Sequence, residues 1–592
     1  MKLETHASWR DTTAVSLALV AAASLVAAGG FDLPEWVRHW LDRFNLVVAI
    51  SFVLLWLLPS AKHSQAPVQR RVSLALIWGG LALLGLAFFM PYAVLRLLPE
   101  EAQPLIREPG FWLVRLFLFC CVLVELLKAG EWVLSRGLRA EILLAGSFVG
   151  IIAMGALLLL LPNAMADGRA PLSLIDAIFT STSATCVTGL GVRDTGADFS
   201  TFGHMVLLGL IQVGGLGIIT FVALVSSFSN KTLPVSQMVA LRQMINAPAL
   251  GDLRGRIAGI VAITFVVEAL GVAALYVFVD AGGSGLQRLE WALFHSVSAF
   301  CNAGFAFQPD NLESLAGNMG ANYTFIVLII VGGLGFLVIP ELLAVLRSGC
   351  RKLLRGRFTA RGRLGVERVR FSLQTRLSLI TTVALLFFGT GAFWILEGGQ
   401  VLQGLGVGEA FTVSLFQSVS ARTAGFNTVT VGDLQNATLL VIVLLMVIGG
   451  CPVSTAGGIK TVTFAILLLG LRALVTGNSR IEAFGRTIPS RVVVSALNVF
   501  LLYISAATAG LILVSWFEPQ LAMRDVLFEC FSALSTVGLG TGITAQLDTG
   551  SKLVLCLLMF VGRIGPIAMV LSVFQTAQAM DYEFPEEDIV VG

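Results

Sequence analysis

Long apolar runs recur along the whole chain. A membrane-spanning helix needs about 20 mostly apolar residues. Four runs within residues 1–137 reach or approach that length, at roughly 14–30, 45–59, 73–98 and 111–128. Because many others follow the first run, we interpret it as a span and not as a cleavable signal peptide. The pattern predicts an all-α polytopic membrane protein.

After residue 137 the long runs alternate with shorter stretches rich in Ser, Thr, Gly and Phe. Each shorter stretch carries the pattern F-x-x-x-S-A, and a glycine follows the serine after five or six residues. The four patterns begin at Phe179, Phe294, Phe416 and Phe528, and their glycines are Gly189, Gly304, Gly425 and Gly538, which lie 115, 121 and 113 residues apart. One such match would be chance, but four in register indicate an internal repeat.

The repeat predicts how the chain is divided. A glycine-bearing apolar run follows each of these glycines after 24–29 residues. The unit is therefore a long helix, a short helix, a glycine-containing loop and a second long helix. We predict an N-terminal extension of four spans (1–137), repeats over 138–230, 231–350, 351–472 and 473–580, and an acidic cytoplasmic tail over 581–592.

The short stretches cannot cross a membrane. From Asp176 to Val187 there are only about a dozen residues, whereas a span needs about 20. A half-length helix leaves backbone groups at membrane depth, where they are tolerated only when buried in protein or facing a water-filled path. Four such helices would satisfy one another by surrounding one axis, so we expect a pore built from four unequal quarters.

The charged residues are few and segregated. Hydrophobic residues make up 56% of the chain and charged residues 13%, against a usual charged share of ~25%; this excludes a nucleic-acid binder and a secreted disulfide scaffold. The connections 229–256, 347–376 and 472–491 hold 18 Lys and Arg (4, 10 and 4) and three Asp and Glu. By the positive-inside rule these connections are cytoplasmic. The short helices then enter from outside, and the N-terminus is cytoplasmic.

Acidic residues lie at or near the start of every short helix, at Asp176, Glu290, Glu409 and Asp525. A carboxylate there suits the positive end of a helix dipole. It would also concentrate cations at the outer mouth. The two interpretations are compatible, and the sequence does not choose between them.

The segments that follow the short helices suit a monovalent cation. Each short helix aims the negative end of its dipole at the membrane centre. The segments contain no carboxylate, and glycine lets a backbone turn its carbonyl oxygens toward an axis. Such oxygens favour a weakly hydrated monovalent ion over a divalent one. The predicted ion-filter residues are Thr185, Cys186, Val187, Thr188 and Gly189; Cys301, Asn302, Ala303 and Gly304; Thr423, Ala424 and Gly425; and Thr536, Val537 and Gly538.

Together these motifs resemble the Trk/Ktr/HKT superfamily of potassium transporters. The resemblance covers about residues 140–577 and rests on TCVTGL, NAGF, SARTAGFNT, GG…STAGGIK and MFVGRIGP. The last motif is most similar to the Ktr-type bacterial membrane subunit. The resemblance implies potassium uptake through one channel-like pore per subunit, with K⁺ held by the backbone carbonyls of the filter.

The resemblance also implies a cellular setting. It implies a homodimer embedded in the lipid of a bacterial inner membrane, on a cytoplasmic ring of nucleotide-binding regulatory subunits. We expect no cofactor in this chain and no nucleic acid, and sodium is a candidate activator. In the plant branch, serine at the first filter glycine accompanies sodium preference. All four positions are glycine here, which favours potassium.

An interruption of the apolar run 437–471 is the candidate gate. Paired glycines and a proline cannot hold a straight helix there, and broken helix at membrane depth indicates a cavity or a moving part. The family resemblance implies an intramembrane loop that obstructs the pore, with mid-span Arg563 against it; Glu268 is the alternative partner of Arg563. The predicted gate residues are Gly449, Gly450, Cys451, Pro452, Val453, Ser454, Thr455, Ala456, Gly457, Gly458, Lys460 and Arg563.

Other functions are less consistent with the sequence. A secondary transporter with alternating access also uses broken helices, but its sites usually lie between two inverted halves. A membrane enzyme would need clustered catalytic side chains, and His204 and His295 are isolated in the sequence. The basic 347–376 connection is either a lipid anchor or a docking site for the regulator, shared with the acidic residues 581–588. With no nucleotide-binding motif in this chain, nucleotide control would have to come from a partner.

Overall fold

The computed structural model describes residues 9–57 except 32, residues 114, 118 and 121, residues 140–217, residues 253–356 except 281 and 283, and residues 371–565 except 479. The predicted span 73–98, most of the span 111–128, most of the connection 229–256 and the tail 581–592 lie outside the described residues.

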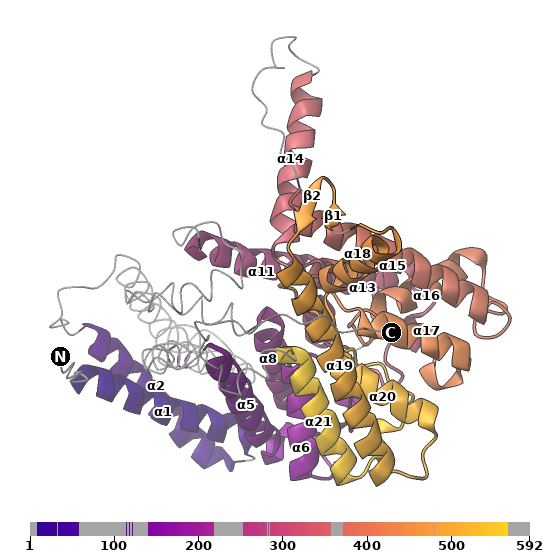
Figure 1. The fold of residues 1–592 in the computed structure, drawn as a ribbon. Helices are drawn as coiled ribbons and strands as arrows, with labels where there is room; N and C mark the ends of the chain where they lie inside the picture. Colours follow the sequence, from indigo (N-terminus) through magenta and orange to yellow (C-terminus); the bar gives the residue numbers. More distant parts are fainter. Residues whose placement is uncertain are drawn as a thin grey trace, which may run out of the picture.

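The described chain is mostly helical, as predicted (Figure 1). Its α-helices are α1 (Trp9–Gly30), α2 (Glu35–Leu57), α5 (Ala140–Leu159), α6 (Leu174–Thr185), α7 (Thr195–Asp198), α8 (Thr201–Leu216), α11 (Leu253–Phe278), α12 (Gly285–Cys301), α13 (Met319–Leu334), α14 (Val338–Gly356), α15 (Leu373–Glu397), α16 (Val407–Ser420), α17 (Asn436–Val447), α18 (Thr461–Val475), α19 (Ser490–Phe517), α20 (Met523–Ser535) and α21 (Thr549–Ile564). Short 3₁₀ turns are η2 (Pro162–Ala164), η4 (Glu313–Leu315), η6 (Val431–Asp433) and η7 (Thr544–Gln546), and β1 (Ile481–Ala483) pairs antiparallel with β2 (Arg486–Ile488).

Four of the described helices are long and apolar enough to cross a membrane. They are α1, α11, α15 and α19, and the pair α13 and α14 would be a fifth only as a span bent by 108°. The long helices expose large apolar side chains to the outside, such as Leu270, Phe387 and Ile395 at 66%, 77% and 79%. Exposure on this scale is stable in lipid and not in water.

The helices after residue 140 form four units that contact one another in a closed ring. The units are α5, α6 and α8; α11, α12 and α13; α15, α16 and α17; and α19, α20 and α21, and within each unit the short helix packs on the long helix. The last helix of each unit packs on the short helix of the next: α8 on α12, α13 on α16, α17 on α20, and α21 on α6. The short helices α6, α12, α16 and α20 have 12, 17, 14 and 13 residues.

The F-x-x-x-S-A phenylalanines anchor the short helices. All four rings are at most 2% exposed and are among the largest fully buried side chains: Phe179, Phe294, Phe416 and Phe528. A buried aromatic ring removes more apolar surface from water or polar contact than any smaller side chain. The motif therefore marks the core as well as the repeat.

A glycine of the long helix meets a serine of the short helix in three units. A Cβ on the glycine would overlap the serine Oγ, and that Oγ donates to a backbone carbonyl of the long helix at 2.8–3.1 Å. The pairs are Gly155 with Ser181, Gly271 with Ser296, and Gly389 with Ser418. In the fourth unit Cys530 stands where the serine would be, and Tyr503 of α19 instead shares a 2.5 Å hydrogen bond with Ser535. Small residues let helices in a membrane approach closely and bond through hydroxyls.

Three of the four closing helices end at the same kind of glycine. Gly217, Gly335 and Gly565 follow α8, α13 and α21 with φ of 74°, 83° and 96°, a left-handed conformation that favours glycine. The sequence predicted a helix end only in the third unit, where α17 stops at Val447. Helix ends at equivalent positions are therefore found in all four units among the described residues.

The N-terminal helices pack against each other and against the first unit. Ser24 Oγ of α1 donates to Asn45 Oδ1 of α2 at 2.7 Å. The end of α1 lies against the first unit, because a Cβ on Gly30 would meet Leu161 and a Cβ on Gly29 would meet Phe202 at 3.0 Å. The described part of the extension therefore packs on the first unit.

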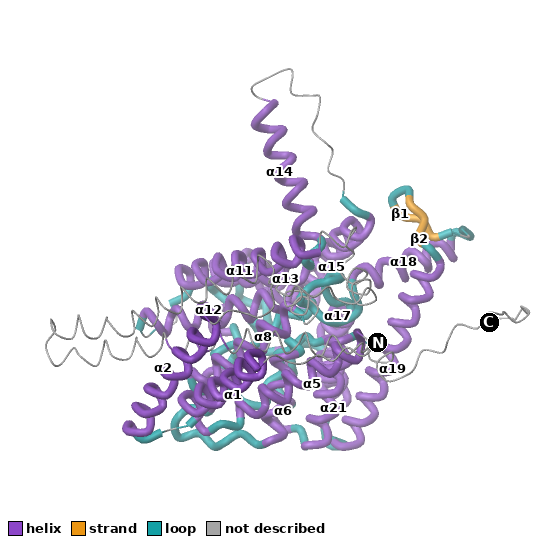
Figure 2. Tube along the Cα trace, turned by 90° about the vertical axis from the view of Figure 1, so that its left-hand side faces the viewer, coloured by secondary structure: helices purple, strands orange, loops and turns teal. Residues whose placement is uncertain are grey.

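Two of the connections predicted to be cytoplasmic lie on one side of the molecule. Figure 2 shows α14 and the β1–β2 hairpin projecting in the same direction. The first part of the 347–376 connection is helical, because α14 continues to Gly356. Ser372 N, just before α15, donates to Glu341 of α14 at 3.0 Å, so the two ends of this connection are tied together.

Replacing Gly389 by alanine tests the glycine–serine contact. The new methyl group would collide with Ser418 and Leu445, and overpacking of this kind costs about 1–3 kcal/mol. We expect a clearly lower thermal unfolding midpoint in detergent. Gly391→Ala is the matched control: it lies on the same helix with nothing within 4 Å, and alanine should leave stability equal or slightly higher. Equal midpoints for the two variants would contradict the packing argument.

Candidate ion filter and gate loop

Each short helix is followed by two left-handed backbone positions, two residues apart. The first is a non-glycine residue: Val187, Asn302, Thr423 and Thr536, with φ of 58°, 60°, 77° and 52°. The second is the predicted filter glycine: Gly189, Gly304, Gly425 and Gly538, with φ of 97°, 70°, 78° and 93°. A strained position that recurs at equivalent places in four units points to a role in the site.

The four filter glycines meet. A Cβ built on any one of them would collide with the carbonyl oxygen that precedes the glycine of another unit. The pairs are Gly189 with Ala303, Gly304 with Ala424, Gly425 with Val537, and Gly538 with Thr188. These contacts run from unit to unit and return to the first. Each position therefore requires glycine for two reasons: its positive φ, and the close approach of a neighbouring backbone.

The serines of the F-x-x-x-S-A motif hold the filter segments. Ser183 and Ser532 each accept a hydrogen bond at 3.1 Å from the backbone N–H of their own filter glycine. Ser298 donates to the carbonyl of Phe305 at 2.9 Å, and Ser420 donates to the carbonyl of Phe426. In the sequence these serines were recognised only as markers of the repeat. Their spacing of five or six residues from the filter glycine was the signal that could have predicted these hydrogen bonds.

Several polar side-chain atoms at the predicted filter are buried without a partner among the described residues. Buried polar groups are normally satisfied by protein, water or ions. The concentration of unpartnered polar atoms at the predicted filter indicates a site that binds water or an ion. The atoms are Thr185 Oγ1, Thr188 Oγ1, Asn302 Oδ1 and Nδ2, Thr423 Oγ1 and Thr536 Oγ1.

The third filter segment differs from the others. Only seven residues separate Phe416 from left-handed Thr423, whereas eight separate the corresponding pairs in the other units. Arg422, which the sequence analysis did not select, is 8% exposed and donates to the carbonyl of Gly449 at 3.0 Å. This bond links the filter to the first residue of the candidate gate. A positively charged residue inside the SARTAGF motif was the sequence signal that could have identified Arg422 as a functional residue.

The predicted interruption after α17 is a loop that closes on itself. Residues 448–460 separate α17 from α18, and Ile448 pairs with Ile459 as an isolated bridge. Gly449 N donates to Ile459 O at 2.9 Å, and Ile459 N donates to Val447 O at 3.0 Å. We call this segment, Ile448 to Lys460, the gate loop. The two ends of the gate loop, where α17 stops and α18 starts, therefore lie next to each other.

The gate loop packs against the second and fourth units. Cys451 N donates to Gly333 O at 2.9 Å, and Phe336 N donates to Val453 O at 2.9 Å. On the other side, a Cβ on Gly457 would collide with Thr536. The loop thus lies directly beside the filter segment of the fourth unit, as the gate prediction requires.

Two cationic side chains hold the carbonyls of the gate loop. Arg563 of α21 donates to Thr455 O and to Gly214 O of α8. Lys460 Nζ donates to Ala456 O at 2.5 Å and to Gly457 O at 3.4 Å. Glu268, the alternative partner of Arg563, accepts a hydrogen bond from Gln212 at 3.1 Å instead. Arg563 therefore joins the first unit, the fourth unit and the gate loop.

The acidic residues at the short helices have local partners. Asp176 forms a 2.8 Å ion pair with Lys552 of α21, Glu290 faces His204 at 3.4 Å, and Asp525 pairs with Arg524 at 3.3 Å. Glu409 accepts from the N-cap backbone of its own helix at 3.4 Å. Asp176, Glu409 and Asp525 lie in the first turns of their helices, as the helix-terminus interpretation expects. For Glu290 that expectation is wrong, because α12 already begins at Gly285 and has no acidic residue in its first turn. The attraction of cations to the mouth stays a prediction.

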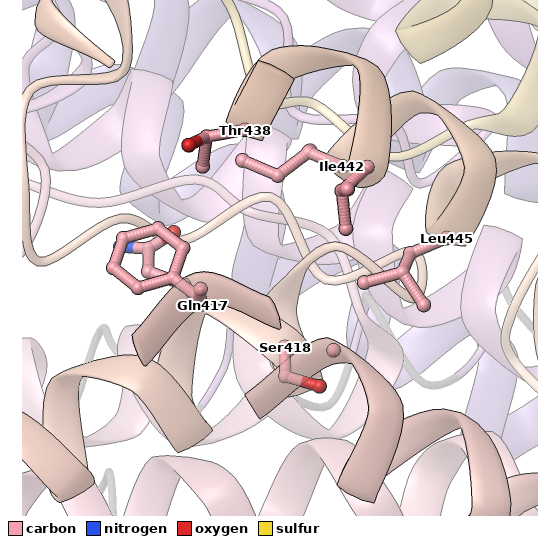
Figure 3. A pocket seen from close by; sticks show the side chains of 8 residues that line it. Gln417, Ser418, Thr438, Ile442 and Leu445 are labelled. Carbon is pink, nitrogen blue, oxygen red and sulfur yellow. The ribbon is translucent and has the colours of Figure 1, made fainter. Parts of the chain in front are cut away.

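A small cavity lies behind the third short helix. Figure 3 shows Gln417 and Ser418 on one side of it and Thr438, Ile442 and Leu445 on the other. It is enclosed by α15, α16 and α17 and has room for about one water molecule. The cavity belongs to the packing of the third unit, since its lining contains none of the predicted filter or gate residues.

Comparisons with known proteins agree with these features. The TrkH family, described as cation transport protein, matches residues 118–580. The Ktr system potassium uptake protein B of Bacillus subtilis is 34% identical over 467 residues, which cover 78% of this chain and 99% of that protein. The potassium/sodium uptake protein NtpJ of Enterococcus hirae is 33% identical over 456 residues, covering 76% and 96%.

A solved structure has the same fold. The crystal structure of the potassium transporter TrkH from Vibrio parahaemolyticus superimposes with a TM-score of 0.58 at 19% identity, covering 86% of this chain and 98% of that chain. The resemblance inferred from the motifs is thereby confirmed, and the protein is a membrane transporter and not an enzyme. The chain belongs to the TrkH family of cation transport proteins.

Proposed function

We propose that this protein takes up potassium across the cytoplasmic membrane through a channel-like pore. The observation that carries the proposal is the meeting of Gly189, Gly304, Gly425 and Gly538 at the ends of four short helices. The printed names of relatives that are identical at about a third of the aligned residues supply the ion: potassium in the Bacillus subtilis protein, and potassium or sodium in the Enterococcus hirae protein.

The backbone of the filter segments is the proposed ion ligand. The segments carry no carboxylate, so a bound cation would be held by carbonyl oxygens that replace its hydration shell. The C-terminal ends of the four short helices add negative partial charge at the same place. The serine hydrogen bonds keep the filter backbone in its left-handed turns. A potassium ion gives up its hydration shell to such ligands at lower cost than the smaller sodium ion.

The gate loop is the proposed barrier to the ion. The proposal is supported by its contacts with Thr536, in the filter segment of the fourth unit, and with Gly333, near the end of α13 in the second unit. Arg563 and Lys460 hold its carbonyls, and their charge opposes the passage of a cation. Opening would require the loop to exchange these hydrogen bonds for others. Arg422, which bonds Gly449, would transmit that movement to the third filter segment.

The assembly is proposed from the names of the relatives. A Ktr system implies a membrane subunit working with a regulatory subunit. From the family resemblance we infer in addition a homodimer on a cytoplasmic ring of nucleotide-binding subunits, in contact with membrane lipid, and from the segregated charges an N-terminus in the cytoplasm. Docking of the regulator on α14 and the rest of the 347–376 connection, and activation by sodium, belong to the same proposal.

Cation flux from the purified protein in liposomes tests the function. We expect flux that follows an imposed voltage and prefers potassium over sodium when potassium, rubidium, sodium or lithium is supplied on one side. Voltage-following flux would distinguish a pore from alternating access, whose rate saturates with conformational cycling. Equal potassium and sodium flux would keep the pore and remove the potassium assignment. Flux that ignores voltage would contradict the pore.

Gly189→Ser should weaken the preference for potassium. The hydroxymethyl group would strain a residue at φ 97° and displace the carbonyl of Ala303, which widens one side of the ring. We expect the ratio of potassium to sodium flux to fall by about tenfold, the factor that 1.4 kcal/mol corresponds to. Gly168→Ser is the control, with φ 77° but nothing within 4 Å. An unchanged ratio in folded Gly189→Ser protein would remove Gly189 from the filter.

Arg563→Ala should increase the leak. The change removes the donors to Thr455 O and Gly214 O and a positive charge beside the filter, so the gate loop loses its link to the first unit. We expect flux at fixed driving force to rise several-fold. Arg472→Ala, at an exposed position on α18, should leave the leak unchanged. Equal leaks in the two folded variants would exclude Arg563 from the gate.

A further inference from the structure

In each of the first three units, the loop that follows the filter contacts the backbone at or just after the filter glycine of the next unit. The residue that makes this contact is the seventh after the filter glycine of its own unit. A Cβ on Gly196 would collide with Phe307 O, and a Cβ on Gly432 would meet Thr541 O at 3.2 Å. The equivalent residue of the second unit is Asn311, and that of the fourth unit is Ala545. Only the second unit carries a hydrogen-bonding side chain at this position.

Asn311 reaches the filter itself. Its Nδ2 donates to the carbonyl oxygen of the filter glycine Gly425 at 3.3 Å, and its Oδ1 accepts from Asn427 N at 3.4 Å. Asn311 has φ 59°, a left-handed conformation that asparagine adopts more easily than other side-chain-bearing residues. The backbone conformation of Asn311 and its side-chain amide therefore both favour this contact with the third unit.

Three further hydrogen bonds fix the loop that presents Asn311. Leu312 N donates to Asn427 O at 3.1 Å. Glu313 accepts from Asn427 Nδ2 and from Thr430 Oγ1, both at 2.9 Å. The second unit thus binds residues 425–430 of the third unit through five hydrogen bonds. Among these five, only the bond donated by Asn311 Nδ2 involves a filter glycine.

This contact makes the filter asymmetric. Among the described residues, the carbonyls of Gly189, Gly304 and Gly538 accept no hydrogen bond, while that of Gly425 accepts one. We propose that Asn311 is a positioning residue that sets the ion preference of the filter by binding the carbonyl of Gly425. The inference rests on the proposed function, because it assumes that the four glycine segments ligate the transported cation.

Two physical effects support it. An amide donor draws on one lone pair of the carbonyl oxygen and leaves a weaker field for an ion. The same bond holds the third segment, which is one residue shorter than its counterparts, at a fixed distance from the others. A segment freed from Asn311 would move toward a smaller ion, and discrimination against sodium depends on resisting that movement.

Ion-dependent thermal stability tests the inference without requiring an open gate. An ion that binds the folded state stabilises it by RT ln(1 + c/Kd) at ion concentration c, so its unfolding midpoint rises with the logarithm of the ion concentration above Kd. Midpoints of the purified full chain in detergent would be measured against KCl and against NaCl, with choline chloride keeping the ionic strength constant. The readout is the ratio of the sodium and potassium dissociation constants fitted to these midpoints. A role confined to folding would shift the midpoints and leave this ratio unchanged.

Asn311→Gly and Asn311→Asp are the informative variants. Glycine keeps the left-handed backbone and reproduces the residue of the first and third units, and aspartate keeps the shape but removes the donor. We expect both to lower the ratio by about fivefold, the factor that corresponds to one net hydrogen bond of about 1 kcal/mol. Thr430→Val is the control, because it loosens the same loop through Glu313 without touching Gly425, and should leave the ratio unchanged.

The outcomes separate the inference from the proposed function. A selective wild type whose ratio is unchanged in both Asn311 variants would overturn the inference alone. An equal change in Thr430→Val would also overturn it, because loop stability and not the Gly425 bond would then set the preference. A wild type stabilised equally by potassium and sodium would overturn the potassium assignment and the inference with it.

Discussion

Backbone groups inside a membrane must find their partners within the protein, and this constraint shapes the rest of the structure. Four short helices end inside the protein. Backbone groups of the filter segments cap their last carbonyls, as Thr188 N does for Ser183 O and Ala303 N for Ser298 O. The four ends are brought together, so that each filter segment is covered by the segment of a neighbour. The glycines, the buried phenylalanines and the serines of the repeat are three consequences of that one arrangement.

Much of this arrangement was predictable from the sequence. The spacing of F-x-x-x-S-A and its glycine indicated the number and order of the short helices, because a twelve-residue apolar stretch has few structures open to it in lipid. The predicted length of about a dozen residues holds for α6, whereas α12 has 17 residues. The Pro- and Gly-rich interruption gave the gate loop for the same reason, since such residues cannot continue a helix. The family resemblance followed from motifs in a fixed order.

Other features depend on contacts between distant residues and could not be predicted. The hydrogen bonds of Arg422 and Asn311 join segments 27 and 114 residues apart, and no local pattern selects their partners. The helix ends at Gly217, Gly335 and Gly565 were missed because a glycine after an apolar run is also compatible with a continuous span. The start of α2 at Glu35, about ten residues before its apolar run, follows from polar residues that continue the helix beyond the hydrophobic stretch.

The contact between the last unit and the first has a consequence for how the protein is made. The ring closes only where α21 packs on α6 and Lys552 pairs with Asp176, 376 residues earlier in the chain. A ribosome delivers α6 long before α21, so the first short helix must wait in the bilayer with an uncovered flank. Until the fourth unit is inserted, the ring lacks the helix that covers α6, and incomplete stages of this kind are where multi-unit proteins are prone to misassembly.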